Sequence, residues 1–154
     1  MCGIAGIVNR NPKFSGSAVA AMTDALKHRG PDGWGYAALG QRTSPAVMTQ
    51  EVPEVNGKVF FGHRRLSIID VEGTRQPLAN EDGSIWVTFN GEIYNYHELA
   101  GSLKNAGHTL REKGDTEVLV HLWEEYGERM TEKLSGMFAF AIYDVPNDTL
   151  FLAR

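Results

Sequence analysis

The 154-residue chain has a single cysteine, and it is the second residue, Cys2. A cysteine thiolate is a strong nucleophile near neutral pH when a base lies beside it. If the initiator Met1 is removed, the α-amine of Cys2 supplies that base, with an unperturbed pKa of about 7.7–8.0. Nucleophile and general base would then be one residue, and no histidine would be required. Alternatively, Cys2 is only the first residue of a buried strand, and its position alone does not decide between the two.

A second set of polar residues has the chemistry needed to hold an amino acid. Arg65 carries a planar guanidinium suited to a carboxylate, and Glu92 and Asp115 are acceptors suited to an ammonium. Asn90 and Gly91 offer a side-chain amide and an unobstructed backbone N–H, which are donors of the kind that stabilise an oxyanion. Taken singly, each also has a structural interpretation: a surface ion pair for the arginine, a turn for the Asn-Gly-Glu segment, and a helix cap for the aspartate.

Hydrophobic patterning predicts the elements that would position these residues. Apolar runs rich in β-branched and aromatic residues predict strands at 2–8, which ends in a polar turn at 9–12, and at 34–39, 59–64, 84–90, 137–143 and 149–152. Apolar residues spaced by three and four predict helices at about 15–28, 95–106 and 115–126, with a short one at 128–134. Most strands follow one another directly, which indicates antiparallel sheets with helices packed outside, an α+β layered fold.

Two further segments differ from these regular elements. Residues 29–35 contain three glycines and a proline, which predicts a constrained loop whose backbone approaches a ligand or another strand closely. Residues 40–57 show little pattern, and we expect one edge strand there between loops.

Length and composition exclude several classes of function. The chain is long enough for one domain, and its 42% hydrophobic residues can form a buried core. The net charge of −4 and the lack of a dense Lys/Arg run argue against a nucleic-acid partner. No window approaches the roughly 18 apolar residues of a membrane span, and no secretory signal is evident, so we expect no membrane partner and a cytoplasmic location.

Six motifs occur in order along the chain: MCGI at 1–4, HRGPDG at 28–33, GHRRLSIID at 62–70, QPL at 76–78, NGEIYN at 90–95 and DTE at 115–117. With these motifs the chain resembles the N-terminal glutaminase domain of class II glutamine amidotransferases. Within that class it is most similar to glutamine-hydrolysing asparagine synthetases. The resemblance extends from Met1 to the closing FAFAIYD stretch and so covers essentially the whole chain.

The resemblance implies a role for each candidate residue. Cys2 would be the catalytic nucleophile, and Asn90 and Gly91 would form the oxyanion hole and contact the substrate. Glu92 and Asp115 would hold the α-ammonium of glutamine. Arg65 would bind the α-carboxylate, and the whole substrate-binding segment that it opens would comprise Arg65, Leu66, Ser67, Ile68 and Ile69.

The resemblance also implies a fold and partners. The fold would be a four-layer α-β-β-α sandwich of antiparallel sheets, of the N-terminal nucleophile hydrolase type. Family members continue past Arg154 with further strands, so we expect 1–154 to be a C-terminally incomplete glutaminase domain whose synthetase domain is absent. No cofactor is expected here, because ATP and Mg²⁺ would belong to the synthetase domain and no Gly-rich pyrophosphate loop occurs in this sequence. The expected partners are glutamine and the C-terminal synthetase domain, and a homodimer is compatible with the family.

Two other functions are alternatives to the glutaminase interpretation. A metal hydrolase is disfavoured because the five histidines, at positions 28, 63, 97, 108 and 121, include no pair at metal-ligand spacing on one helix. No metal is therefore expected. A non-catalytic module that binds glutamine or docks a partner domain without turnover is the stronger alternative.

Overall fold

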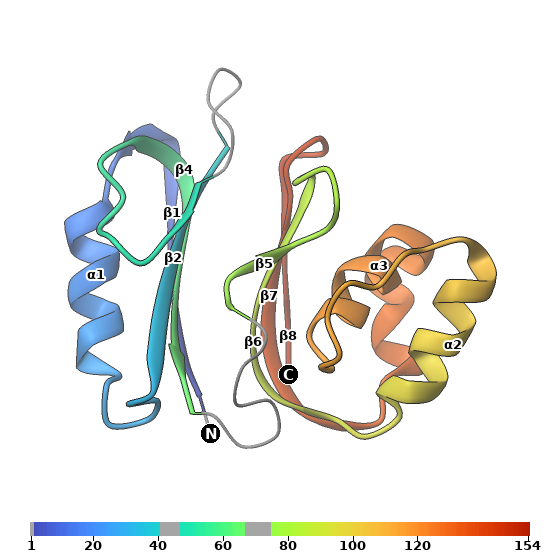
Figure 1. The fold of residues 1–154 in the computed structure, drawn as a ribbon. Helices are drawn as coiled ribbons and strands as arrows, with labels where there is room; N and C mark the ends of the chain where they lie inside the picture. The colour runs from blue at the N-terminus through green and yellow to red at the C-terminus, as the bar shows by residue number, and fades with distance from the viewer. Residues whose placement is uncertain (1, 41–46, 67–74) are drawn as a thin grey trace.

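A computed structural model describes residues 2–40, 47–66 and 75–154 of the chain. Within these residues, two four-stranded antiparallel sheets lie face to face, and helices cover the outer side of each (Figure 1). The layers follow the order helix, sheet, sheet, helix. The four-layer sandwich implied by the sequence is therefore confirmed.

The first sheet has the strand order β1-β4-β2-β3 and lies under helix α1 (Gly16–Ala25). Its strands are β1 (Gly3–Phe14), β2 (Gly33–Leu39), β3 (Val47–Thr49) and β4 (Asn56–Arg65). The short β3 pairs only with β2 and is the edge strand expected between residues 40 and 57. Apolar side chains of α1, among them Val19, pack against Phe60.

The turn expected at 9–12 is not present, because β1 continues through it to Phe14 with an irregularity in its pairing between Val8 and Lys13. Polar residues signalled a turn there. In the structure the buried Asn9 side chain instead donates hydrogen bonds to the Gly57 carbonyl oxygen (3.0 Å) and the Ser15 hydroxyl (3.2 Å). Contacts with distant residues thus satisfy the polar group inside a strand.

The second sheet has the strand order β5-β6-β7-β8. Its strands are β5 (Leu78–Ala79), β6 (Ile85–Ile93), β7 (Gly136–Asp144) and β8 (Thr149–Ala153). Its outer face is covered by α2 (Tyr96–Ala106), α3 (Glu117–Tyr126) and a 3-10 helix (Gly127–Lys133). Helix α2 ends as expected at Gly107, whose φ of 106° is left-handed and suits glycine.

Alternation along the strands divides the core into layers. On β6, Val87 and Phe89 face α2 and α3, whereas Trp86 packs between the sheets with Phe61 of β4. Because side chains two residues apart share a face, His63 and Arg65 follow Phe61 on the inner face, and Thr88 and Asn90 follow Trp86. The residues predicted to do chemistry therefore lie at the ends of two facing strands.

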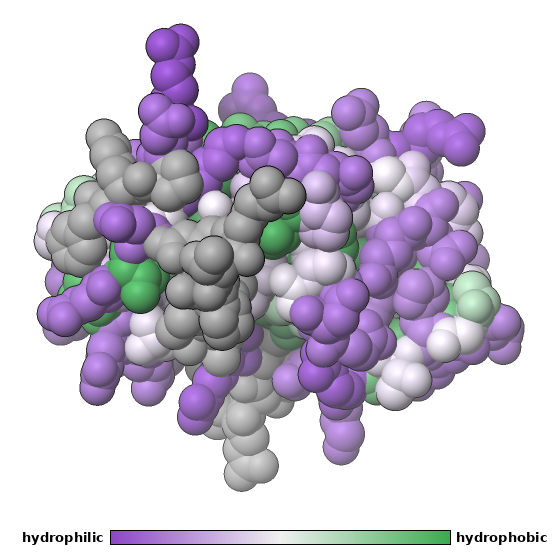
Figure 2. Space-filling model, turned by 90° about the horizontal axis from the view of Figure 1, so that it is seen from above, coloured by the Kyte–Doolittle hydropathy of each residue, from purple (hydrophilic) through white to green (hydrophobic). Residues whose placement is uncertain are grey.

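The outer surface has a different character from this core. Seen from above, most of the visible face is hydrophilic, and hydrophobic residues show only in small areas between polar ones (Figure 2). Among the described residues, no helix has both the length and the hydropathy that crossing a lipid bilayer requires.

Candidate active site

The Cys2 sulfur lies beside the end of β4. Gly3 pairs with Arg64 across β1 and β4, so the residue before Gly3 reaches the backbone that follows Arg65. The Leu66 amide N–H donates a hydrogen bond to Sγ over 3.4 Å, and the sulfur lies 3.9 Å from the Leu66 carbonyl oxygen. The half-buried cysteine therefore lies next to the arginine that the sequence predicted to bind a carboxylate.

The glycine-rich loop before β2 supports this strand end from the other side. The Asp32 amide donates to the Arg65 carbonyl oxygen over 3.0 Å. A Cβ atom on Gly30 would lie 2.5 Å from the Arg64 carbonyl group, so only glycine fits at that approach. The close backbone contact expected of residues 29–35 is confirmed, and it fixes the position of Arg65.

Three residues of the predicted substrate segment, Ser67, Ile68 and Ile69, lie outside the described residues. Arg65 and Leu66 are described, and both are half-buried. The charge of Arg65 acts on its neighbour His63, whose pKa is lowered to about 3 by burial and, secondly, by this guanidinium. His63 is thus a neutral, buried histidine beside the site.

One edge of β6 carries a row of backbone N–H groups beyond the end of β5. The Phe89 amide donates to the Gln76 side-chain oxygen (2.7 Å), and the Ile93 amide donates to the Asp115 carboxylate (2.9 Å). Successive residues of a strand point their N–H groups to opposite edges, so every second residue shares an edge. The Gly91 N–H consequently points to this same edge, between the two occupied amides.

Asn90 and Gly91 are part of β6 and not of a turn after it, so the structural interpretation of this segment as a turn is wrong. A Cβ atom at position 91 would lie 2.2 Å from the Met137 carbonyl oxygen of β7, and glycine is what allows the pairing to continue. The Oδ1 atom of Asn90 is buried without a hydrogen-bond partner among the described residues. Within the described ranges, this oxygen therefore does not fix the carboxamide.

Two carboxylates lie at this end of β6: Glu92 is a residue of the strand, and Asp115 accepts the Ile93 amide at its edge. Burial raises the pKa of Asp115 above its usual range. The pKa of Glu92 is also raised, first by burial and then by the charge of Asp115, while the N-terminal ammonium acts in the opposite direction. Two partly buried carboxylates that disfavour each other's ionisation form a place where a cation is stabilised.

The interpretation of Asp115 as a helix cap is wrong, because Thr116 occupies the N-cap position of α3. Helix α3 begins at Glu117 after Thr116, and no side-chain cap hydrogen bond is present at its start. The Asp115 carboxylate instead accepts the Ile93 amide of β6. This residue ties the helical layer to the strand that carries Asn90 and Gly91.

Gln76 is a positioning residue that sequence reasoning did not assign. Its Oε1 accepts the Phe89 amide, and its Nε2 donates to the Thr116 hydroxyl over 3.4 Å. The carboxamide thereby links the edge of β6 to the start of α3, next to Asp115. Its place in the QPL motif was the available signal in the sequence.

A pocket of about 260 Å³ opens on the far side of Gln76 and is also lined by Trp34, Gln50 and Arg75. None of the residues that the sequence nominated for chemistry lines this pocket.

Comparisons with known proteins find relatives that match the full length of this chain. Asparagine synthetase [glutamine-hydrolyzing] 2 of Bacillus subtilis strain 168 is 41% identical over 158 residues, which cover 100% of this chain and 19% of the relative. The asparagine synthetase [glutamine-hydrolyzing] of Asparagus officinalis is 39% identical over 156 residues, which cover 100% of this chain and 23% of the relative. This chain spans about a fifth to a quarter of these curated relatives.

A solved structure has the same fold. The glutamine phosphoribosylpyrophosphate amidotransferase of B. subtilis, complexed with ADP and GMP, superposes with a TM-score of 0.72 at 25% sequence identity. The superposition covers 97% of this chain and 36% of the other. The family model described as glutamine amidotransferase domain matches residues 1–154. The chain belongs to the glutamine amidotransferase domain family.

Proposed function

We propose that this chain hydrolyses the side-chain amide of glutamine to glutamate and ammonia through a thioester on Cys2. The observation that carries the proposal is the hydrogen bond from the Leu66 amide to the Cys2 sulfur, directly after Arg65. It supports a reaction in which the Cys2 thiol is the nucleophile and the neighbouring Arg65 binds the α-carboxylate of an amino acid. Family membership and the matching order of the six motifs support the same reaction.

Substrate binding would use both ends of glutamine. The Arg65 guanidinium would pair with the α-carboxylate, aided by the segment from Leu66 through Ser67, Ile68 and Ile69. Glu92 and Asp115 would hold the α-ammonium, since their mutual destabilisation is relieved by a bound cation. The side-chain carboxamide would then extend toward the sulfur in a near-attack geometry.

The chemical step begins with removal of Met1, which exposes the α-amine of Cys2. This amine takes the thiol proton while the sulfur attacks the carboxamide carbon, and the carbonyl oxygen becomes an oxyanion. The Gly91 N–H and the Asn90 side chain would stabilise that oxyanion. The amine returns the proton to the nitrogen, which leaves as ammonia, and water then cleaves the thioester to glutamate and regenerates the thiol.

The use of the ammonia is a further part of the proposal. Because the relatives named above are glutamine-hydrolysing asparagine synthetases and much longer, we propose that the ammonia serves an ATP-dependent synthetase domain of the same protein. ATP and Mg²⁺ would act in that domain, and residues 1–154 would be the glutaminase part without a cofactor. The proposal also includes a cytoplasmic location. A chain with one cysteine forms no internal disulfide, which suits the reducing conditions of the cytoplasm.

The test is glutamate release by the chain, with the N-terminus defined by intact mass. We expect the form lacking Met1 to release glutamate, and the form that retains Met1 and the Cys2→Ala variant to release none. A glutamine-mimicking electrophile should label Cys2 only in the processed form. Glutamine binding without glutamate release by the processed chain would overturn the proposal and identify a non-catalytic binding module.

A further inference from the structure

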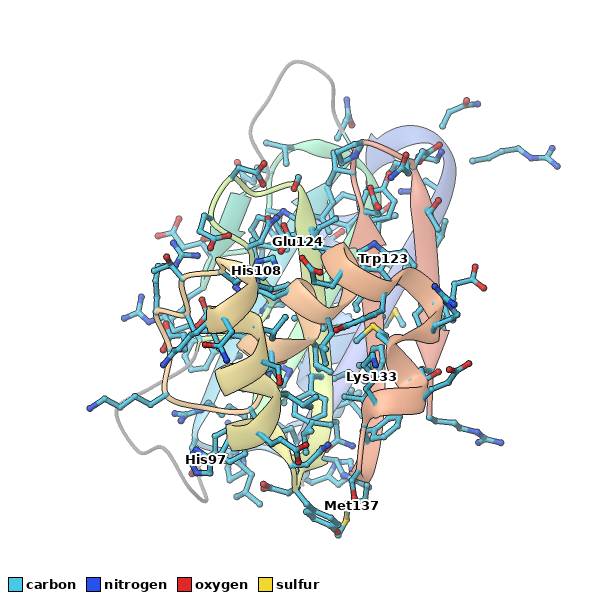
Figure 3. The ribbon with its side chains drawn as sticks, turned by 90° about the vertical axis from the view of Figure 1, so that its right-hand side faces the viewer. His97, His108, Trp123, Glu124, Lys133 and Met137 are labelled. Atoms are coloured by element: carbon cyan, nitrogen blue, oxygen red, sulfur yellow. The ribbon has the colours of Figure 1, made fainter. Side chains whose placement is uncertain are left out.

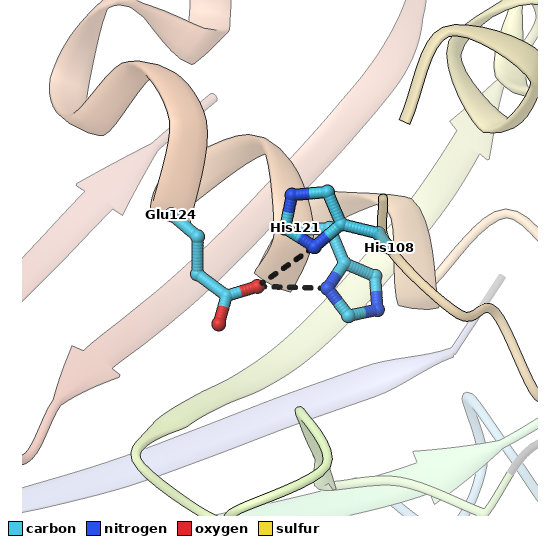
Figure 4. A group of neighbouring side chains, drawn as sticks. All are labelled: His108, His121 and Glu124. Carbon is cyan, nitrogen blue, oxygen red and sulfur yellow. Dashed lines mark hydrogen bonds and ion pairs between the residues drawn. The ribbon is translucent and has the colours of Figure 1, made fainter. Parts of the chain in front are cut away.

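Two histidines and a glutamate gather at one end of the helical layer, outside the candidate active site. His108 follows Gly107 at the end of α2, and His121 and Glu124 lie one turn apart on α3. In Figure 3, His108 and Glu124 lie together at one end of the helical layer, and His97 lies toward the opposite end. The three side chains converge (Figure 4).

The spacing of the three side chains is close to that of a metal site. Oε2 of Glu124 lies 2.7 Å from Nδ1 of His121 and 3.6 Å from Nδ1 of His108. One ligand atom from each residue lies within 4.8 Å of the others. Ligand atoms around a tetrahedral zinc ion, at bond lengths of about 2.0–2.1 Å, are about 3.3 Å apart. Small side-chain rotations would therefore bring all three atoms to bonding distance of one ion.

The buried imidazole of His121 provides an independent indication of a ligand. The side chain is fully buried, and its Nε2 atom has no hydrogen-bond partner among the described residues. If the single proton of a neutral ring sits on Nδ1 to meet Glu124, the Nε2 lone pair points toward carboxylate oxygens of Glu81 and Glu117, each 3.9 Å away. With a metal ion on Nδ1, the ring proton would be on Nε2, and this N–H would point toward those two carboxylates.

The remaining contacts match those that support metal-bound histidines and carboxylates. Nε2 of His108 lies 2.9 Å from a Glu125 carboxylate oxygen, and Nε2 of His121 lies 3.9 Å from one of Glu117. If the metal binds Nδ1 of each histidine, each Nε2 therefore faces a carboxylate. The other oxygen of Glu124 accepts the Asn80 side-chain amide over 2.7 Å. Partners of this kind fix the tautomer and the orientation of metal ligands.

Charge also favours a cation at this position. Four carboxylates, those of Glu81, Glu117, Glu124 and Glu125, surround the two histidines. Among the described side chains, Arg111 approaches this group, with its Nε 3.7 Å from Glu117. A divalent ion would offset much of the remaining negative charge.

We propose that His108, His121 and Glu124 bind a divalent transition-metal ion of the zinc type, with water as the fourth ligand. Two imidazoles and one carboxylate suit Zn²⁺, whereas Mg²⁺ and Ca²⁺ prefer oxygen ligands. The ion ties the segment after α2 to α3 and so stabilises the helix that Asp115 and Thr116 precede. Histidine spacing alone gave no sign of it, because one ligand is the glutamate three residues after His121.

The test is metal binding by the chelator-treated 154-residue chain, titrated with Zn²⁺ by calorimetry and with Co²⁺ by visible absorption. We expect one ion per chain and the intense visible bands of tetrahedral Co²⁺. His108→Ala and Glu124→Gln, which change partly exposed residues, should each weaken Zn²⁺ binding by at least about 100-fold. Glu125→Gln should weaken it by about 10–100-fold, as loss of a supporting carboxylate does.

His97→Ala is the matched control, because it removes an exposed histidine of α2 that lies away from the cluster. It should bind Zn²⁺ like the unchanged chain. Cys2→Ala should also keep the ion. The proposal is overturned if the unchanged chain binds no stoichiometric Zn²⁺, if the His108 and Glu124 variants bind as tightly as it does, or if Cys2→Ala loses the ion.

Discussion

His63 on β4 and Thr88 on β6 meet between the two sheets, with Nδ1 of the imidazole 3.4 Å from Oγ1 of the threonine. The ring is 1% exposed, and its Nε2 has no hydrogen-bond partner among the described residues. Burial and the nearby Arg65 lower its pKa to about 3, so the ring remains neutral in the folded chain. The neutral imidazole therefore adds no positive charge beside Arg65.

This lowered pKa predicts a pH dependence of folding. The unfolded chain binds a proton on His63 below about pH 6.5, whereas the folded chain resists it until about pH 3. The free energy of unfolding should therefore fall as the pH drops through this window, by about 3–5 kcal/mol from this residue. Urea titrations from pH 7 to 3 should show a shallower fall for His63→Gln. His97→Gln, an exposed control, should follow the unchanged chain, and parallel curves for all three would refute the prediction.

The raised pKa values of Glu92 and Asp115 predict how glutamine binding varies with pH. Both groups must be ionised to hold an ammonium, and both take up a proton at a higher pH than ordinary carboxyl groups. Affinity for glutamine should thus fall on acidification before ordinary carboxylates titrate, and binding should release protons. Calorimetry in two buffers of different ionisation enthalpy measures that release. Asp115→Asn should reduce it, and an unchanged proton count in that variant would contradict the assignment.

The same burial predicts that Asp115 costs stability in the ligand-free chain. Its folded-state pKa is raised, so its contribution is favourable at low pH and is lost as the pH rises through that pKa. Asp115→Asn keeps an oxygen for the Ile93 amide and removes the charge. We expect it to stabilise the ligand-free chain at pH 7 by up to about 1 kcal/mol while weakening glutamine binding. Thermal unfolding at pH 7 and at pH 3 checks this, since the gain should vanish at the lower pH.

Loss of the Asn90 carboxamide should affect the chemical step more than binding. In the proposed mechanism it stabilises the oxyanion, and removing one such donor typically lowers turnover by about 10²–10³-fold. Asn90→Ala should therefore reduce kcat by that factor with little change in KM. Asn105→Ala, on the exposed face of α2, should leave both constants unchanged. A raised KM at an unchanged kcat would assign Asn90 to substrate binding alone.

Gln76 should be important for stability as well as for the site. Gln76→Ala leaves the Phe89 amide of a buried strand without an acceptor, at a cost of about 1–3 kcal/mol. Gln76→Glu keeps that acceptor and loses only the donor to Thr116. We expect the alanine variant to be clearly less stable in urea than the glutamate variant. Equal destabilisation would show that the contact with Phe89 does not carry the effect.

Sequence patterning predicted the type and order of most elements, because alternation and helical spacing are local properties of the chain. It predicted turns wrongly at two places where contacts with other parts of the chain let a strand continue. The polar Asn9 signalled a turn, but Gly57 and Ser15 supply partners that let the strand continue. Asn90 and Gly91 looked like a turn, but pairing with β7 extends β6 past them.

The candidate site shows the same division. The residue types suggested a nucleophile and groups for a carboxylate and an ammonium, and the motifs indicated the family that the comparisons show. Sequence could not show that Gln76 reaches both Phe89 and Thr116, the second of them 40 positions along the chain. It also could not show that His108 meets His121, since a turn and half a helix separate them in sequence.

The contact between Leu66 and Cys2 has a consequence for selectivity. Leu66, whose amide donates to the sulfur, directly follows Arg65, the residue proposed to bind the carboxylate. The span available to a substrate is therefore the distance from the Arg65 guanidinium to the sulfur that the Leu66 amide holds. Asparagine, anchored by its carboxylate, would present its carbonyl one carbon short of the thiol. Choice between the two amino acids would then come from reach and not from any difference in their functional groups.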